Sequence, residues 1–368
     1  MTQSSPAAVS QPALIWDIGT GYDLFASLYV LHNPSEFALR AAWAAGVRSR
    51  LGQEAREFLQ NIVSYLSAPL EWVYGLPKPK DSLTVVRELE KLDDEDVLTT
   101  LFLAGDCSDV TSEVYRRILN TGSWNEEDMR ELMACAEKHQ TCYQANRESI
   151  AVFLDWCTKR QEFGKRYKQV IAEYYESFFR EEERRITPDI ERAYASAREM
   201  AQKLPTASLF EELTRGLSGE SYLKHKSVVL VPSFWAAPRV FCGMIGPDES
   251  ILVFGARPND ASLVPGQPVP DDLYIALQAL GDQTRLRILR LLSDRPLTQT
   301  EIAKKLRLRT PTIGHHMKGL RIAGLITISQ CDGDQTRYAT RFSRVADTCE
   351  ALREFLSDQQ QDNSKNGP

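Results

Sequence analysis

Apolar residues recur every three to four positions along most of the first two thirds of the chain. The pattern runs from about Trp16 to Leu223 and is clearest in residues 23–31, 37–47 and 54–66. A spacing of three and four places apolar side chains on one face of a helix, so it predicts a large helical N-terminal region.

The stretch from Arg160 to Arg185 predicts one long helix, because it contains no proline and only one glycine, Gly164. Its apolar and aromatic residues fall on a single stripe, which is most simply a core face, although aromatic helix walls can also enclose a ligand. The stripe consists of Phe163, Tyr167, Val170, Tyr174 and Phe178.

The pattern changes after residue 226. Three short β-rich runs, at 227–231, 240–245 and 251–254, predict a small antiparallel sheet over about 227–255. Residues 258–271 contain four prolines and little periodicity, which indicates a linker.

The C-terminal part alternates short helical patterns with turn signals. Residues 274–280 and 285–292 predict two helices, and a capping box of Thr298 and Glu301 opens a third helix over 299–306. A fourth helix follows, from Thr310 to Gly324. Two strands come next, at 325–329 and 337–341, joined by a turn at 332–333, so this order predicts a winged helix-turn-helix.

The fourth helix has two distinct faces when its residues are placed about 100° apart. Ile313, Met317 and Leu320 fall on one side, which we expect to pack inward. His315 and Lys318 fall opposite, flanked by Thr312, Gly314 and Gly319, whose small size allows close approach to a groove. Such a helix fits the major groove of B-DNA, where base edges can be read.

Fold class and domain organisation follow from these patterns. The chain is predicted to be mainly α: a large helical N-terminal domain with a small antiparallel β element, then a C-terminal winged helix-turn-helix of the α+β type. The predicted segments are a disordered N-terminus at 1–12, the helical domain at 13–257, the linker at 258–271, the winged domain at 272–358 and a disordered tail at 359–368.

Length and composition agree with this organisation. The 368 residues suggest two or three domains, and 43% hydrophobic with 26% charged residues exclude a mostly disordered chain. No apolar run reaches the ~20 residues that a membrane crossing requires. The chain has seven scattered cysteines, and its Ser-, Pro- and Ala-rich start lacks a signal pattern. Both features favour a reducing, cytoplasmic location. A DNA-binding role would associate the protein with the nucleoid.

The charge is unevenly distributed. The chain carries −6, yet residues 272–341 contain twelve Lys and Arg against six Asp and Glu, a local balance of +6. The rest therefore carries −6 minus +6, or −12. A basic module beside an acidic body is typical of a domain that meets nucleic-acid phosphate.

Two runs carry a family resemblance: LQALGDQTRLRIL at 277–289 and PTIGHHMKGL at 311–320. They resemble the DNA-binding domain of ArsR-family transcriptional regulators, over about the last quarter of the chain. The resemblance implies a recognition helix from Thr310 to Ala323, a wing tip at Asp332 and Gly333, and dimerisation through the first and last helices. The last helix, 343–357, carries a suitable apolar stripe of Val345, Cys349, Leu352 and Leu356.

The sequence departs from that family at several points. Arg309 stands where the family commonly has a serine cap, so we expect Thr310 to cap the helix. The wing is acidic, which leaves only Arg337 and Arg341 as nearby cations. The thiol motif of metal-sensing members is absent from residues 297–301. A fainter likeness links residues 22–28, the segment around Trp43 and residues 229–233 to an uncharacterised helical region that precedes such domains in some long ArsR-family proteins.

The resemblance and the helix faces together define the expected sites. His316 lies at the edge of the core arc, where a structural role and a DNA contact are equally consistent with the pattern. The predicted DNA-binding residues are Thr310, Thr312, Gly314, His315, His316, Lys318, Arg321 and Arg337.

Two other motifs have simpler explanations than a site. Cys135, His139 and Cys142 share one helical face and could ligate zinc, but no fourth ligand is evident, so a buried stripe is favoured. Residues 19–21 contain two glycines without a third or a preceding strand, which favours a turn over a phosphate loop. We therefore assign no metal, no cofactor and no catalytic residue.

The predicted function is that of a homodimeric, sequence-specific DNA-binding regulator, most simply a repressor, acting on an inverted-repeat operator in double-stranded DNA. The N-terminal domain would sense an unknown small-molecule effector or mediate assembly. The alternatives are an enzyme, or a protein-interaction scaffold, in the helical domain fused to an autoregulatory winged helix.

Overall fold

The computed structural model describes residues 11–63, 66, 68–103, 109–139, 146–217, 224–331 and 335–365. The chain divides into two compact units. We call residues 12–195 with 225–256 the sheet unit, and residues 1–11, 196–224 and 257–368 the C-terminal unit. Helices dominate both, so the predicted mainly α fold class is confirmed.

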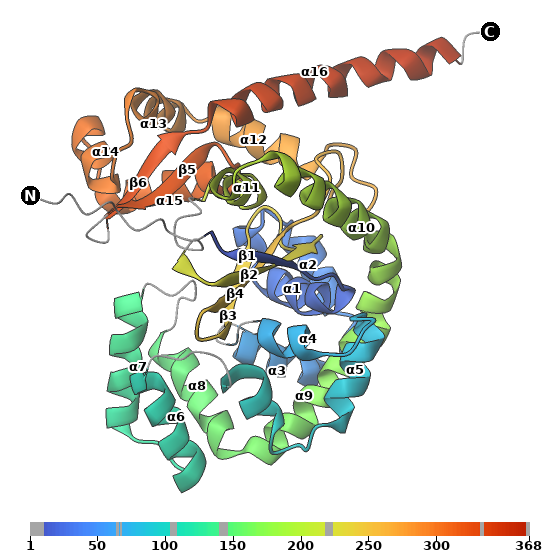
Figure 1. Ribbon diagram of the computed structural model, residues 1–368, viewed down its shortest axis with the longest axis vertical. Helices are drawn as coiled ribbons and strands as arrows, with labels where there is room; N and C mark the ends of the chain where they lie inside the picture. The colour runs from blue at the N-terminus through green and yellow to red at the C-terminus, as the bar shows by residue number, and fades with distance from the viewer. Residues whose placement is uncertain are drawn as a thin grey trace, which may run out of the picture. The chain divides into compact units, whose positions relative to one another are not determined.

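The sheet unit begins with strand β1 and continues through a series of helices before the chain returns to the sheet (Figure 1). Short helical turns at Pro34–Glu36 and Thr99–Leu103 interrupt the series. The helices are α1 Thr20–His32, α2 Ala41–Arg48, α3 Gln53–Val63, α4 Leu70–Gly75, α5 Ser82–Lys91, α6 Asp109–Thr121, α7 Glu126–His139, α8 Arg147–Thr158 and α9 Arg160–Tyr174.

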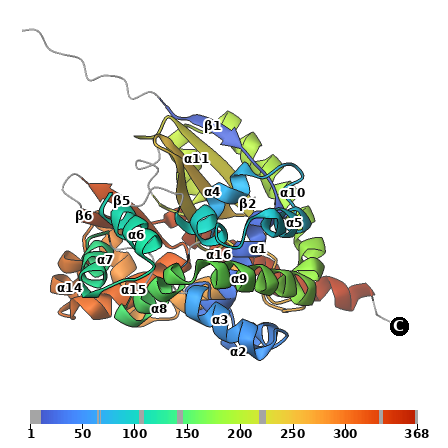
Figure 2. The ribbon, with the colours of Figure 1, turned by 90° about the horizontal axis from the view of Figure 1, so that it is seen from below.

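The long helix predicted from residue 160 is present, with an irregularity in its middle. Helix α9 passes into a π-helical turn at Tyr175–Phe179 and then into α10, Arg180–Lys203. All five residues of the predicted stripe, from Phe163 to Phe178, are buried, so they form core. Figure 2 shows α9 beside α5 and α8, which it contacts.

The sheet has four strands in the order β1-β2-β4-β3: β1 Ala13–Trp16, β2 Ser227–Ser233, β3 Phe241–Gly246 and β4 Glu249–Gly255. Only β3 and β4 pair antiparallel; β1 with β2 and β2 with β4 are parallel. Of the two pairings that join predicted strands, β3 with β4 is antiparallel as expected, but the antiparallel prediction is wrong for β2 with β4. Strand β1 was not predicted. Strand β2 is buried at every position, as expected for a parallel strand covered on both faces.

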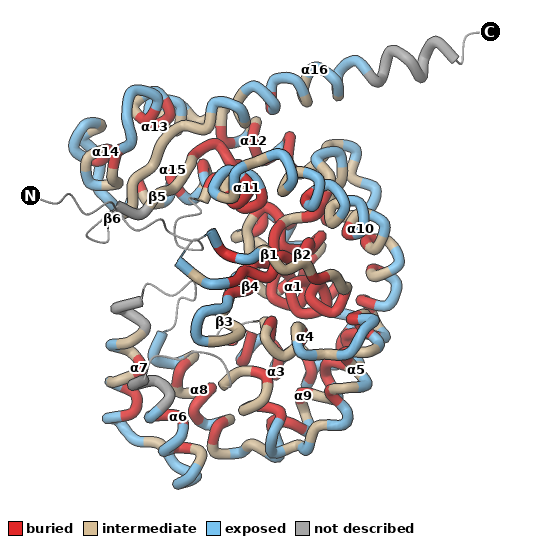
Figure 3. Tube along the Cα trace, viewed as in Figure 1, coloured by how far each residue is buried: buried red, intermediate tan, exposed pale blue. Residues whose placement is uncertain are grey.

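Helix α1 lies at the centre of the sheet unit. It is buried from Thr20 to Leu31, which makes it a helix that is covered on all sides (Figure 3). It contacts β2 as well as α2, α3 and α5. Polar residues on α1 are consequently held in the interior, where each requires a partner.

The C-terminal unit contains the predicted winged helix-turn-helix. Its core includes Ile288, Ile302, Ile313 and Leu325. The predicted wing turn at 332–333 lies outside the described residues. The elements are α11 Thr206–Leu213, α12 Asp271–Leu280, α13 Gln283–Asp294, α14 Gln299–Leu306, α15 Thr310–Ile322, β5 Ile326–Cys331, β6 Gln335–Thr340 and α16 Phe342–Lys365.

Two features of this unit differ from expectation. Helix α16 spans Phe342–Lys365 and so extends past residue 359, where the sequence analysis places the start of the tail. The segment after α11 also packs on the wing: Ile328 N–H donates to the carbonyl oxygen of Gly216 at 2.7 Å, and Leu217 bridges Ile328 in parallel. Gly216 has φ +104°, and a Cβ there would lie 2.7 Å from the Ile326 oxygen, so the close approach requires glycine.

Across the described ranges, no helix is both long enough and apolar enough to span a bilayer.

Candidate nucleic-acid interface

Side-chain caps fix the helices that precede the recognition helix. Thr298 Oγ1 accepts a hydrogen bond from Glu301 N–H at 3.2 Å, and Glu301 Oε2 accepts one from Thr298 N–H at 2.8 Å, so the predicted capping box is present. Asp282 caps α13 by accepting from Arg285 N–H at 2.8 Å. These local bonds set the directions of α13 and α14, against which α15 packs.

Helix α15 presents the two faces that its sequence predicts. Ile313 and Leu320 are fully buried and Met317 is nearly so. The opposite face is open: the side chains of Thr310, Thr312, His315, Lys318 and Arg321 are exposed. Among the described residues, none of these five side chains has a hydrogen bond or an ion pair, so all remain available to a partner.

His316 turns away from that open face. Its side chain is 15% exposed, and its Nδ1 lies 3.6 Å from Asp282 Oδ1, at the cap of α13. The Nδ1 atom is buried without a hydrogen-bond partner. The structure therefore places His316 between α15 and α13, in the structural position that the sequence left open.

Arg337 is also engaged within the protein. Its Nη1 lies 3.7 Å from Glu301 Oε2 and donates to the Pro296 carbonyl oxygen at 3.3 Å. Arg341, the other cation near the wing, pairs with Glu212 at 2.6 Å. Both side chains thus fasten the wing strands to the rest of the unit.

The two glycines of α15 have different surroundings. A Cβ on Gly314 would meet only the Gln299 side chain, at 3.9 Å, so the helix is open there. A Cβ on Gly319 would lie 2.7 Å from the Arg285 guanidinium. Gly319 therefore makes room for Arg285 and not for a nucleic-acid groove.

The start of α15 differs from expectation in one detail. Arg309 occupies the N-cap position, and no side chain caps the helix, whose first residue is Thr310. The prediction that Thr310 caps the helix is therefore wrong. Its hydroxyl is exposed instead, beside Pro311 in the first turn.

A cationic segment surrounds the turn between α14 and α15, and the sequence reasoning named only part of it. Residues 302–331 contain no Asp or Glu, although they contain six Lys and Arg. Over 272–341 the remaining six cations balance the six acids, so the whole +6 excess comes from this segment. The absence of Asp and Glu from residues 302–331 is the sequence signal that could have identified the cations beyond Lys318 and Arg321. The six are Lys304, Lys305, Arg307, Arg309, Lys318 and Arg321, all exposed.

The stripe predicted for dimerisation is only partly covered. Val345 packs against the C-terminal core and Leu352 is half-buried. Cys349 is an exposed free thiol, and Leu356 is 63% exposed. Tyr274, on the neighbouring helix α12, is 55% exposed, so apolar surface is present on both helices.

A buried ion cluster joins the segment after α11 to α12 and α16. Asp272, 5% exposed, accepts from Arg215 Nη1 at 2.8 Å and from Arg344 Nη2 at 3.1 Å. Burial alone would raise the pKa of Asp272, but the two guanidinium groups outweigh burial and hold its pKa at about 2. The carboxylate is thus charged at neutral pH and fixes the relative positions of these elements.

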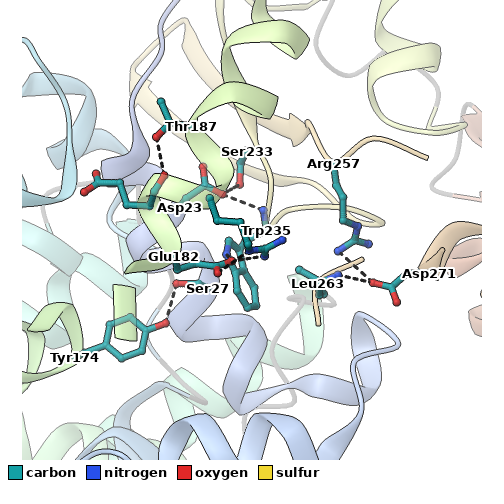
Figure 4. A network of polar contacts seen from close by, with 12 residues as sticks. Asp23, Ser27, Tyr174, Glu182, Thr187, Ser233, Trp235, Arg257, Leu263 and Asp271 are labelled. Atoms are coloured by element: carbon teal, nitrogen blue, oxygen red, sulfur yellow. Dashed lines mark hydrogen bonds and ion pairs between the residues drawn. The ribbon is translucent and has the colours of Figure 1, made fainter. Parts of the chain in front are cut away.

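Figure 4 shows polar contacts of the sheet unit around Asp23, Glu182 and Trp235. Asp23 Oδ1 accepts from Ser233 Oγ at 2.8 Å and from Trp235 N–H at 2.9 Å, while the Trp235 indole donates to Glu182 Oε1 at 3.1 Å. Arg185 Nε donates to Glu182 at 2.9 Å. Asp23 Oδ1 and the Glu182 carboxylate are thus bound by groups of the protein itself.

The glycines at 19–21 serve packing. A strand, β1, does precede them, contrary to expectation. However, Gly21 N–H donates to the Lys80 carbonyl oxygen at 2.9 Å, and a Cβ on Gly19 would lie 2.3 Å from that oxygen. Gly19 is the N-cap of α1, and Thr20 and Gly21 belong to its first turn, so these residues start a helix that binds its own chain.

The cysteine motif of α7 is only partly described. Cys135 is half-buried. The side chain of His139 and all of Cys142 lie outside the described residues. Within the described part of the chain, no three His, Cys, Asp or Glu residues come together as metal ligands.

Helix order, the hairpin and the open polar face of α15 define a winged helix-turn-helix. Comparison with protein families gives the more specific result: residues 282–327 match the model described as bacterial regulatory protein, arsR family. This match confirms the resemblance to that family seen in the sequence of the same segment.

A solved structure titled ArsR-like Transcriptional Regulator from Rhodococcus sp. RHA1 is 22% identical, covers 26% of this chain and 88% of its own, and has a TM-score of 0.23. The search of curated proteins gives no match.

Proposed function

We propose that this protein is a sequence-specific, DNA-binding transcriptional regulator, acting as a repressor, and not an enzyme. The observation that carries the proposal is the open face of α15, where exposed polar side chains that have no hydrogen bond or ion pair among the described residues lie opposite a buried face. A helix packed in this way can enter the major groove while its own core stays intact.

His315 is the proposed reader of base edges, and Lys318 with Arg321 the proposed phosphate contacts on the same helix. An imidazole can donate or accept a hydrogen bond, whereas lysine at an exposed position acts mainly as a point charge. Thr310 and Thr312 supply hydroxyl groups beside them. His316 and Arg337, which bind inside the protein, would support this surface from behind.

The experiment is a duplex-binding titration of the full chain over a range of salt concentrations, first with random-sequence DNA and then with duplexes selected by the protein. Affinity should fall steeply with salt.

His315→Ala should weaken binding to the selected duplex by about 1–3 kcal/mol and leave random-sequence binding almost unchanged. Lys318→Ala should weaken both alike. The matched control is His225→Ala, in the sheet unit; absence of duplex binding by the wild type at low salt would refute the proposal.

We further propose a homodimer formed through α12 and α16. Exposed Leu356 and Tyr274 would become buried in it, and a two-fold axis would set the two α15 helices into successive major grooves about 34 Å apart. The operator would then be an inverted repeat. Leu356→Glu should shift sedimentation toward the monomer without unfolding, because Leu356 is already 63% exposed, whereas Leu83→Glu in the sheet unit should not. A wild type that is monomeric at micromolar concentration contradicts the dimer.

The sheet unit is the proposed sensing or assembly part. It holds a narrow apolar pocket lined by residues that include Phe25, Leu28, Ile62 and Tyr167.

A further inference from the structure

Arg307 ends helix α14 in a conformation that disfavours its own side chain. Its backbone is left-handed, with φ 57° and ψ 41°. The N–H groups of Arg307 and Leu308 both donate to the Ala303 carbonyl oxygen, the second at 3.0 Å, which closes the helix. Glycine is the usual residue at this position, because a Cβ is strained there.

A second arginine of the C-terminal unit has the same left-handed backbone, but its side chain makes a buried contact. Arg215 also has a positive φ, of 57°, and its guanidinium binds the buried carboxylate of Asp272 at 2.8 Å. Arg307 has the same backbone, but among the described residues its exposed side chain has neither an ion pair nor a hydrogen bond. Within the described part of the chain no contact of this side chain offsets the strain, so the guanidinium is free to bind a partner.

The neighbours of Arg307 indicate which partner suits it. Lys304 and Lys305 lie in the last turn of α14, and Arg309 immediately precedes α15. All are exposed, and no acid intervenes between residues 302 and 331. Repulsion among four close cations is unfavourable in the free protein, and a regularly spaced polyanion relieves it.

We propose that Arg307, together with Lys304, Lys305 and Arg309, binds backbone phosphates of the duplex whose major groove α15 enters. This clamp rests on the proposed DNA-binding function and adds to it a sequence-independent contact at the turn between α14 and α15. Its cations neutralise phosphates and release counterions, whereas His315 reads bases.

The test separates backbone strain from charge at one position of the full-length protein. Arg307→Gly removes both strain and charge, and Arg307→Lys keeps both. Glycine relieves the left-handed strain of the folded state but gives the unfolded chain more freedom, and these two effects oppose each other. We expect the relief of strain to equal or exceed the second effect, so the Gly variant should melt at or above the wild-type temperature. Its affinity for a random-sequence duplex should fall about three- to tenfold at moderate salt, and the slope of log K against log salt should decrease by about 0.9.

Arg307→Lys should bind with nearly wild-type affinity and slope. Arg290→Ala, which removes an exposed cation on α13, is the charge-matched control and should have little effect. The selected and random duplexes should lose affinity by the same factor in Arg307→Gly. A Gly variant that binds as tightly as the wild type at every salt concentration, or a Lys variant as weak as the Gly variant, overturns the clamp but leaves DNA binding standing. A wild type that binds no duplex overturns both.

Discussion

Two buried aspartates, one in each unit, titrate in opposite directions. Asp272 in the C-terminal unit is 5% exposed and lies between Arg215 and Arg344, and its pKa is about 2. Asp23 in the sheet unit is fully buried; burial raises its pKa to about 7, although hydrogen bonds from Trp235 and Ser233 act against that rise.

Burial acts in the same direction on both carboxyl groups, so their partners make the difference. Asp272 has two guanidinium groups in contact, whereas Asp23 has only neutral donors and its Oδ2 has no hydrogen-bond partner. The nearby Glu182 raises the pKa of Asp23 further. Full burial of a carboxyl group without a cation therefore raises its pKa toward neutral pH, whereas burial beside two cations keeps the carboxyl group charged.

The largest effect is expected from breaking the paired site. Asp272→Asn leaves two arginines, 19% and 14% exposed, without their counter-charge, which should cost about 3–5 kcal/mol of unfolding free energy. Chemical denaturation followed by far-ultraviolet circular dichroism measures the loss. Tryptophan fluorescence should keep its wild-type transition, because all six tryptophans lie in the sheet unit.

The control is Glu350→Gln, whose carboxylate pairs with Arg353 on the exposed side of α16. Exposed pairs contribute about 0–1 kcal/mol, so little change is expected. Equal losses from Asp272→Asn and Glu350→Gln would contradict the assignment of Asp272 as a buried structural charge.

The next effect is the pH dependence of the sheet unit. The folded pKa of Asp23, about 7, lies above the unfolded value of about 3.8, so the folded state binds more protons between them. The stabilisation is complete below pH ~3.8 and is lost as pH rises through about 7, by up to about 1.4 kcal/mol per pH unit. Tryptophan-monitored denaturation between pH 5 and 8 measures it, and Asp23→Asn should flatten the profile. An unchanged slope in that variant would assign the effect to another group.

The C-terminal unit should respond to acid in the opposite sense. The folded pKa of Asp272 lies below its unfolded value, so its stabilisation is complete above pH ~4 and is lost as pH falls toward about 2. Circular dichroism across this range should show the loss, and Asp272→Asn should abolish it. A variant that keeps the full acid sensitivity of the wild type would be inconsistent with this assignment.

The smallest effect on stability is expected at the open face of α15. Lys318→Ala removes an exposed, unpaired cation, so the unfolding free energy should change by less than about 0.5 kcal/mol. Duplex affinity should nevertheless fall. A large loss of stability would mean that Lys318 supports the fold. The contrast between the buried, paired charge of Asp272 and the exposed charge of Lys318 would then be wrong.

Local patterns predicted much of the candidate interface. The capping box at Thr298, the burial of Ile313 and Met317, and the exposure of His315 and Lys318 all follow from residues within a few positions of one another. Helical periodicity and capping are short-range properties, so one sequence is enough to predict them. The cationic segment was equally visible, since only the distribution of acids had to be counted.

Contacts between distant parts of the chain could not be obtained in this way. Ala13 pairs with Ser227 in a parallel register, and no local pattern specifies a partner so far along the chain. His316 lay on the boundary between two helix faces, and only its packing beside Asp282 decided its direction. Thus the sequence alone determined the helix order and the faces of α15. The tertiary structure decided which charges are paired, because Arg215, Asp272 and Arg344 meet only when α11, α12 and α16 have packed.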